Sequence, residues 1–304
     1  MRRHAALNRE GSRMPEPSTE SVAKQYRYDL LTWPEINAAA AMKKVVVLPV
    51  GATEQHGPHL PLDTDFKLAS AVAFEAGRRS PEDLLVLPPV PYGYTHHVQD
   101  FPGTINIEPS TFIKYLVDIT RSVAYHGFKR IVILNGHGSN AHLVEQAGRQ
   151  TIMQTDALCV TLSWWQLVGE FWNRELRTSV IPGGCAHACE LETSMYLHVD
   201  PAHVQTDKIK DNLAEYHRLP DEDRWHFSDL TAGSIATLIE WTSTYTPTGV
   251  IGQPEQATKE KGRRVFDHAA DQLVSMVRWF RKRPAPPRRD RHAAPPTFAL
   301  PFGF

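Results

Sequence analysis

Short runs of β-branched and other apolar residues alternate along the chain with segments whose apolar residues recur at helical spacing. Continuous apolar runs predict buried strands over residues 45–51, 84–90, 130–135 and 157–163. Helical spacing predicts helices over residues 66–79, 111–126, 141–154 and 258–281. Pro88 and Pro89 lie inside the second run, so this strand is expected at an edge of the sheet or to end early.

Strands separated by helix-length segments are typical of βαβ units, in which helices cover both faces of a parallel sheet. The pattern therefore predicts an α/β fold with a largely parallel sheet. Ligands of such folds bind outside the carboxyl ends of the strands, so functional residues are expected at this edge of the sheet.

Both ends of the chain differ from this central part. Residues 1–25 are polar and rich in Arg, Ser, Glu and Pro, and residues 282–304 begin with a basic, proline-rich stretch. Neither composition favours a packed core, so we expect disordered tails on either side of one domain over residues 26–281. The alternative for the apolar residues 298–304 is docking on a partner subunit.

The charge of the chain is nearly balanced, with 33 Lys and Arg against 34 Asp and Glu and a formal net charge of −1. This balance gives no reason to expect nucleic acid or an anionic membrane as a partner. The three cysteines cannot all pair, and the polar start of the chain does not resemble a signal peptide. We therefore expect a cytoplasmic protein with reduced thiols.

Three clusters of carboxylate and imidazole side chains follow predicted strands or lie in glycine-rich turns. Their members are Glu54, His56 and Asp65 in the first cluster, His137 in the second, and His187, Glu190 and Glu192 in the third. Such a mixture suits Zn²⁺ or Mn²⁺, and a shared carboxylate suits two cations about 3.5–4 Å apart. Each cluster alone has a simpler explanation, as a surface ion pair, a turn residue or helix N-terminal charges. Together they favour a metal site.

Two other motifs have weaker support. Residues 136–141 match the Gly-x-Gly-x-x-Ala pattern of dinucleotide-binding proteins, but no acidic residue ends the next predicted strand. Cys185, His187 and Cys189 have the spacing of soft zinc ligands, but a fourth such ligand is missing. Neither a nicotinamide enzyme nor a thiolate zinc site is therefore favoured.

Residues 51–65, Gly-Ala-Thr-Glu-Gln-His-Gly-Pro-His-Leu-Pro-Leu-Asp-Thr-Asp, resemble the first signature of the creatininase family of amidohydrolases. Segments that resemble its later signatures follow in the same order, at residues 100–105, 135–140, 187–194 and 248–262. The resemblance covers residues 28–281. It implies a three-layer α/β/α sandwich, two divalent metal ions (Zn, Mn or Fe), a small-molecule substrate and a homo-oligomer, commonly a hexamer.

The resemblance also implies a set of metal ligands. Glu54, Asp65 and His137 resemble the ligands of one cation. His56 and Asp65 resemble ligands of the other cation, so that Asp65 bridges the two. Glu192 is the candidate that completes the second ligand set.

Catalytic and substrate-binding roles follow from the same resemblance and from position. His187 or Glu190 is expected to protonate the departing nitrogen. The loop that contains Thr95 and His97 is expected to form a wall of the substrate pocket, together with Ser139.

The chain departs from creatininase itself at two places. Gly138 and Ser139 replace an aromatic residue and a metal-binding glutamate, and Gly183 and Gly184 stand where creatininase has an aromatic residue near its substrate. These differences argue against creatinine as the substrate. We predict that a metal-bridged hydroxide cleaves a non-peptide amide-type C–N bond, as in a lactam or formamide. The alternatives are hydrolysis of a C–C bond in a cyclic polyhydroxy ketone (the opening of an oxidised inositol ring) and a non-enzymatic binding module that uses the basic residues 281–291.

Overall fold

A parallel sheet of four strands forms the centre of the molecule in the computed structural model, which describes residues 18–213, 228–287 and 289–294. The strands lie in the order β2-β1-β3-β4. Their bounds are β1 Val45–Val50, β2 Leu84–Val86, β3 Arg130–Asn135 and β4 Leu158–Ser163. In register, Val46 of β1 lies between Leu85 of β2 and Ile131 of β3. The predicted α/β fold with a largely parallel sheet is confirmed.

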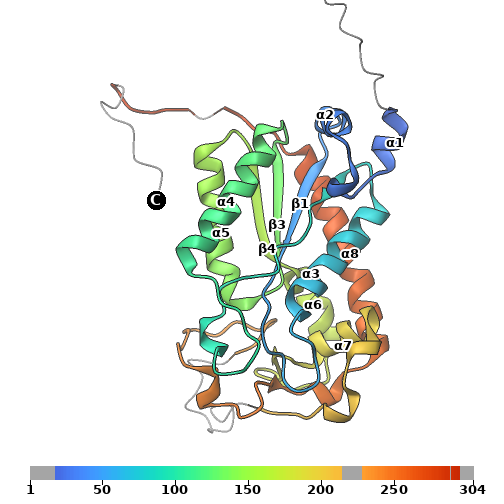
Figure 1. Cartoon of the computed structure of the whole chain (residues 1–304), viewed down its shortest axis with the longest axis vertical. Coiled ribbons are helices and arrows are strands. Elements are labelled where there is room, and N and C mark those ends of the chain that lie inside the picture. The colour runs from blue at the N-terminus through green and yellow to red at the C-terminus, as the bar shows by residue number, and fades with distance from the viewer. Residues whose placement is uncertain (1–17, 214–227, 288, 295–304) are drawn as a thin grey trace, which may run out of the picture.

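Helices cover both faces of this sheet, which makes three layers (Figure 1). On one face pack α3 (Thr64–Arg79) and α8 (Lys259–Lys282), with α7 (Glu190–Val199) against α8. On the other face pack α4 (Pro109–Tyr125) and α5 (Ala141–Gln154), and α2 (Trp33–Ala41) extends this layer. The three-layer sandwich implied by the family resemblance is therefore present.

The continuous apolar runs are explained by the two covered faces. Successive residues of a strand point to opposite faces, so Val45 and Val47 enter the core beneath α3 and α8, whereas Val46 and Leu48 enter the core beneath α4 and α5. All six residues of β1 are buried. Burying one such side chain stabilises the fold by roughly 1.5–3 kcal/mol.

The edge strand β2 is shorter than the apolar run predicted. It ends at Val86, before Pro88 and Pro89, which have no N–H to donate to a neighbouring strand. The strand lies at the edge of the sheet, as those prolines predicted.

The N-terminal tail is also shorter than predicted. Residues Thr19–Lys24 form helix α1, and Val22 in it is fully buried. The buried Lys44 amine donates to the main-chain oxygens of Val22 (2.6 Å) and Gln25 (2.8 Å), and these bonds tie the segment to the domain. The prediction of a disordered tail is therefore wrong for residues 18–25. Residues 1–17 and the proposed docking segment 298–304 lie outside the described residues.

A second, two-stranded sheet lies at the carboxyl ends of the parallel strands, at the lower end of Figure 1. It pairs β5 (Cys185–His187) with β6 (Ile251–Gly252) in antiparallel fashion. The short helix α6 (Gly169–Phe171) follows β4 on the way to this sheet. The arrangement brings His187 over the loop that leaves β1, since the His187 ring bonds to Gln55.

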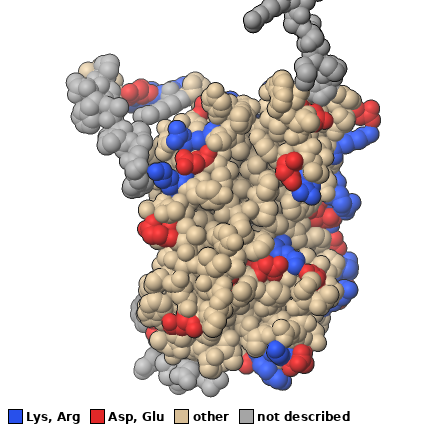
Figure 2. All heavy atoms as spheres, viewed as in Figure 1, with Lys and Arg blue, Asp and Glu red and all other residues tan. Residues whose placement is uncertain are grey.

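Charged side chains of both signs are interspersed on the face drawn in Figure 2. Within the described ranges, no helix combines the length and the apolar composition that crossing a membrane requires.

Candidate metal centre

Two close backbone contacts bring the ends of β1 and β3 to the start of α3. A Cβ atom on Gly51 would lie 2.3 Å from the main-chain nitrogen of Phe66. A Cβ atom on Gly136 would lie 2.2 Å from the main-chain oxygen of Asp65. Only glycine allows these approaches. As a result, Asp65 in the first turn of α3 lies between the loop after β1 and the turn after β3.

One group of potential ligands consists of Glu54, Asp65 and His137. The His137 Nδ1 atom is 3.3 Å from Glu54 Oε1 and 3.1 Å from Asp65 Oδ2. All three side chains are buried, and one ligand atom from each lies within 4.8 Å of the others.

A second group consists of His56, Asp65 and Glu192. The His56 Nε2 atom is 3.1 Å from Asp65 Oδ1 and 3.8 Å from Glu192 Oε1. Asp65 thus presents one carboxylate oxygen to each group. This is the arrangement that a carboxylate shared by two cations requires. A third set, Glu54, His56 and His187, overlaps both groups.

The three imidazoles are oriented by main-chain carbonyl groups. The outer N–H of each ring donates to one carbonyl oxygen, which directs the inner nitrogen at the carboxylates. The acceptors are Glu54 O for His56 (3.2 Å), Tyr94 O for His137 (2.9 Å) and Gln55 O for His187 (2.8 Å). This is the outer bonding pattern of metal-ligating histidines.

Two buried atoms at the centre of the cluster are evidence for a cation site. Among the described residues, His56 Nε2 and Asp65 Oδ2 are buried and form no hydrogen bond, although each faces a group of opposite charge at 3.1 Å. Buried polar atoms nearly always have a partner. Nitrogen and oxygen atoms that converge in this way fit a divalent cation.

The charge of the cluster points to the same conclusion. The carboxylates of Glu54, Asp65 and Glu192 are almost completely buried, which is costly without a compensating positive charge. Burial lowers the pKa of His137, but the Glu54 and Asp65 carboxylates outweigh it and raise the pKa to about 10. Burial likewise opposes the rise in the pKa of His56, yet Asp65 and Glu192 raise it well above its usual value. Divalent cations would replace these protons as the counter-charge.

A pocket of about 510 Å³ opens over this cluster. His97 and Ser139 line it, and the His97 Nε2 atom lies 3.4 Å from the Ser139 hydroxyl. Burial lowers the pKa of His97 to about 4, so this ring is neutral near pH 7. His187 also lines the pocket and is 15% exposed there.

Thr95 has a different place from the one predicted. Its side chain is fully buried, and its hydroxyl donates to the Glu54 carboxylate. Thr95 is not among the described residues that line the pocket. It orients a potential metal ligand, which corrects the prediction that it contacts the substrate.

Glu190 is also directed away from the cluster. Its carboxylate is fully buried, forms an ion pair with Lys261 and accepts a hydrogen bond from the Ser179 N–H at 2.9 Å. Residues two apart on a helix do not face the same way, and Glu192 is the one directed at His56. Glu190 does not reach the pocket, which corrects the prediction that it protonates the substrate.

Three residues of the site were missed in the sequence. Tyr94 contributes a main-chain oxygen, which every residue type possesses, so its identity gives no signal. Gln55 contributes its main-chain oxygen and also its side-chain amide, which lies 3.0 Å from His187 Nε2. His59 is buried behind the cluster and lies with Nε2 2.9 Å from the Thr193 hydroxyl. His59 lies in the same segment, residues 51–65, as His56, and this proximity in sequence could have indicated that it belongs to the site.

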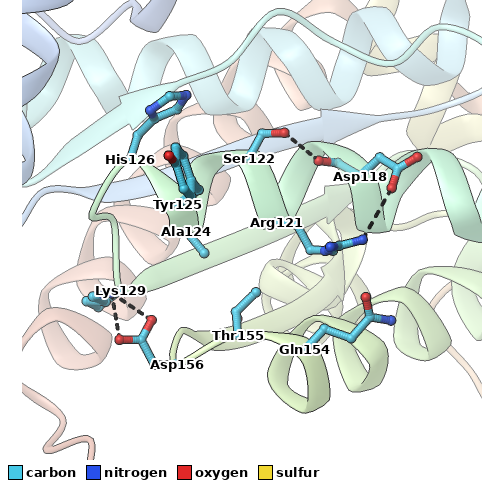
Figure 3. Close-up of a pocket in the computed structure, with 10 residues that line it drawn as sticks. All are labelled: Asp118, Arg121, Ser122, Ala124, Tyr125, His126, Lys129, Gln154, Thr155 and Asp156. Carbon is cyan, nitrogen blue, oxygen red and sulfur yellow. Dashed lines mark hydrogen bonds and ion pairs between the residues drawn. The ribbon is translucent and has the colours of Figure 1, made fainter. Parts of the chain in front are cut away.

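A second depression on the described part of the surface lies elsewhere. It measures about 820 Å³ and is drawn in Figure 3, between the end of α4 and the end of α5. Its charged side chains pair with one another, as Lys129 does with Asp156 at 2.6 Å. It lies at the amino ends of β3 and β4, opposite the cluster, and contains none of the predicted site residues.

Comparisons with known proteins identify relatives of this chain. The sequence is 34% identical over 258 residues to the mycofactocin precursor peptide peptidase of Mycobacterium ulcerans, with 82% of this chain and 86% of the relative covered. It is 26% identical over 264 residues to the 3-dehydro-scyllo-inosose hydrolase of Thermotoga maritima, with 83% and 82% covered.

Solved structures of creatininase also match the fold. A form named for manganese superposes with a TM-score of 0.72 at 26% identity, over 84% of this chain and 98% of the other. A variant of Zn–Zn type superposes with a TM-score of 0.71 at the same identity and coverage. The family model for creatininase, described as creatinine amidohydrolase, matches residues 29–277. This chain is therefore a member of the creatininase family of hydrolases.

Proposed function

We propose that this protein is a two-cation hydrolase that cleaves an amide-type C–N bond. The observation that carries the proposal is Asp65, whose two oxygens face His56 and His137 in two separate ligand groups. Zn²⁺, Mn²⁺ or Fe²⁺ bound there would polarise the scissile carbonyl and lower the pKa of a bound water to about 7.

Five side chains are proposed as the ligands of the two cations. Glu54, Asp65 and His137 would hold one cation, and His56, Asp65 and Glu192 the other. The main-chain acceptors fix the three imidazoles before any cation binds, so little reorganisation is needed.

His187 is the side chain placed to move a proton. It lines the pocket, and its outer nitrogen is fixed on the Gln55 oxygen at 2.8 Å, so Nδ1 faces the reacting centre. Nδ1 would accept a proton from the attacking water and pass it to the departing nitrogen, and such a transfer typically accelerates a reaction about 10²–10⁴-fold.

The test combines metal analysis with a substrate panel. The protein, stripped by a chelator and reloaded with Mn²⁺ or Zn²⁺, should bind two ions per chain and release amine or ammonia from lactams or formamides. Asp65→Ala should lose both ions and the hydrolysis together. Retention of two ions by this folded variant would refute the shared carboxylate.

A second candidate is hydrolysis of a peptide bond, favoured by the similarity to a peptide peptidase over 82% of this chain. The same site chemistry serves both substrates. Short peptides in the panel separate the two candidates. Release of acid without amine from cyclic polyhydroxy ketones would instead favour ring opening, the activity named for the relative from Thermotoga maritima.

A further inference from the structure

We infer that the substrate of this site carries an apolar group beside its scissile amide and that the pocket wall opposite the cluster binds this group. The inference rests on the proposed amide hydrolysis and adds the class of amide. It is carried by the composition, the size and the attachment of that wall.

The wall combines apolar and polar side chains. Its apolar and aromatic members are Val98, Leu230, Leu238, Ile239, Tyr245 and Ile251, and between them lie Ser228, Asp229, Ser234, Thr237, Glu240 and Thr242. Leu238 and Ile239 line the pocket and yet remain 51% and 84% exposed. Covering such side chains with an apolar group of a ligand is favourable, because it removes apolar surface from water.

The size of the pocket leaves room for more than a small polar amide. Its volume of about 510 Å³ lies within the range of roughly 300–1,000 Å³ that is usual for drug-sized ligands. A formamide or a small lactam placed at the cluster would leave most of this volume to water. A larger substituent would fill it.

The charges that line the pocket disfavour an anionic substituent. Among the described residues that line it, none is Lys or Arg and Glu240 adds negative charge, whereas the charge of Asp229 is paired with Arg177. A phosphate or carboxylate on the substituent would have no bidentate partner there. A neutral apolar group fits better.

The wall is attached at its first end to the strand that carries His187. Leu230 donates its N–H to Cys185 of β5 at 2.8 Å. Beside it, the Arg177 and Asp229 side chains form an ion pair at 2.6 Å and are both completely buried. The wall and the proposed proton donor are therefore parts of one framework.

The second end of the wall is attached to the loop that follows β2. The Ser243 hydroxyl donates to the Asp100 carboxylate, and the rings of Trp241 and His96 lie 4.9 Å apart. A wall held at both ends is formed before the substrate arrives, which reduces the entropy lost on binding.

The test uses two series of amides on the metal-loaded protein. One series lengthens the acyl group from formyl to hexanoyl on a fixed amine, and the other lengthens the amine on a fixed acyl group. In the series whose lengthened group faces the wall, whether acyl or amine, kcat/KM should rise by up to about fourfold for each added methylene until the wall is covered. The affinity of the matching product, measured by calorimetry, should rise in parallel.

Variants of the wall give the matched comparison. Ile239→Ser should flatten this dependence and lower kcat/KM for the longest substrate by about tenfold, with little effect on the formyl amide. Ile235→Ser is the control, because Ile235 belongs to the same segment and is 73% exposed but does not line the pocket. It should leave the dependence unchanged.

The outcomes separate this inference from the proposed function. If amides are cleaved but neither series depends on chain length, or if Ile235→Ser acts like Ile239→Ser, the apolar wall has no role in specificity and amide hydrolysis stands. If metal-loaded protein cleaves no amide of either series, the proposed function falls and this inference falls with it.

Discussion

Replacing Lys261 by methionine would leave the carboxylate of Glu190 buried without its cation. Glu190 is fully buried at the first position of α7, and Lys261 in the first turn of α8 forms its ion pair. Methionine keeps most of the length of the lysine side chain and removes its charge. Two N–H groups, from Thr178 at 3.2 Å and from Ser179 at 2.9 Å, would remain as hydrogen-bond donors to the carboxylate.

The expected loss of stability follows from this geometry. Removing one partner of a buried ion pair typically destabilises a protein by about 3–5 kcal/mol. Because the Lys261 side chain is 16% exposed and other donors remain, we expect the lower end, about 3 kcal/mol. At roughly 2–4 °C per kcal/mol for a domain of this size, the melting temperature should fall by about 6–12 °C.

The pH dependence of this loss has a definite sign. Burial raises the pKa of Glu190, but Lys261 and Ser179 outweigh it and hold the pKa below its ordinary value of 4.5. A carboxyl group with a lowered pKa in the folded state contributes stability above the unfolded pKa, and this contribution is lost as the pH falls through the folded pKa. The difference in stability between Lys261→Met and the natural protein should therefore shrink below about pH 4.5.

Urea unfolding with the cations removed measures this loss as a lower midpoint at an unchanged slope. The double variant Glu190→Gln, Lys261→Met is the control, and it should recover much of the stability because no charge remains buried. The reasoning would be refuted by a loss under 1 kcal/mol. It would also be refuted if the folded double variant bound two cations and yet lost turnover about 100-fold, since Glu190 would then act on the substrate.

The remaining predictions concern the metal cluster. His187→Asn should keep both cations but lower kcat by about 10²–10⁴-fold, and loss of a cation in metal analysis would make His187 a ligand instead. Gly136→Ala should weaken metal binding and lower the free energy of unfolding by about 1–3 kcal/mol, because the new Cβ would lie 2.2 Å from the main-chain oxygen of Asp65 and would displace this residue. Gly138→Ala should change stability by less than about 0.5 kcal/mol, because nothing lies within 4 Å of its Cβ, and an equal effect of the two variants contradicts this account. A cation at about 100 times its Kd should stabilise the chain by about 2.7 kcal/mol, and calorimetry that finds no change on chelation argues against a metal site.

Membership of the creatininase family leaves the substrate open, and the site shows where it is decided. The ligand groups around Asp65 use residue types that the family signature also contains. The wall residues Leu230, Leu238 and Ile239 lie outside the segments that resemble the family signatures, whereas Ile251 lies inside one of them. On the two proposals above, chemistry and specificity would be carried by largely different parts of the chain, and variants can separate them.

The sequence alone determined the central sheet and most of the potential ligands. The apolar runs of β1 and β3 predicted their bounds closely, because a strand buried on both faces must be apolar at every position. Glu54, His56 and Asp65 lie in one short segment directly after β1, so the placement of that strand end largely fixed their neighbourhood.

Tertiary structure decided which side chains face the cluster and which only support it. Glu190 and Glu192 are two residues apart on α7. Glu190 forms an ion pair with Lys261, whereas Glu192 faces His56, and the packing of α7 against α8 determines which carboxylate faces the cluster. Thr95 is of a residue type found in many pocket walls, and only its contact with Glu54 shows its place. The hydrogen-bond acceptors of the outer imidazole nitrogens are main-chain oxygens. Every residue type has such an oxygen, so only the tertiary structure shows which of them orient the rings.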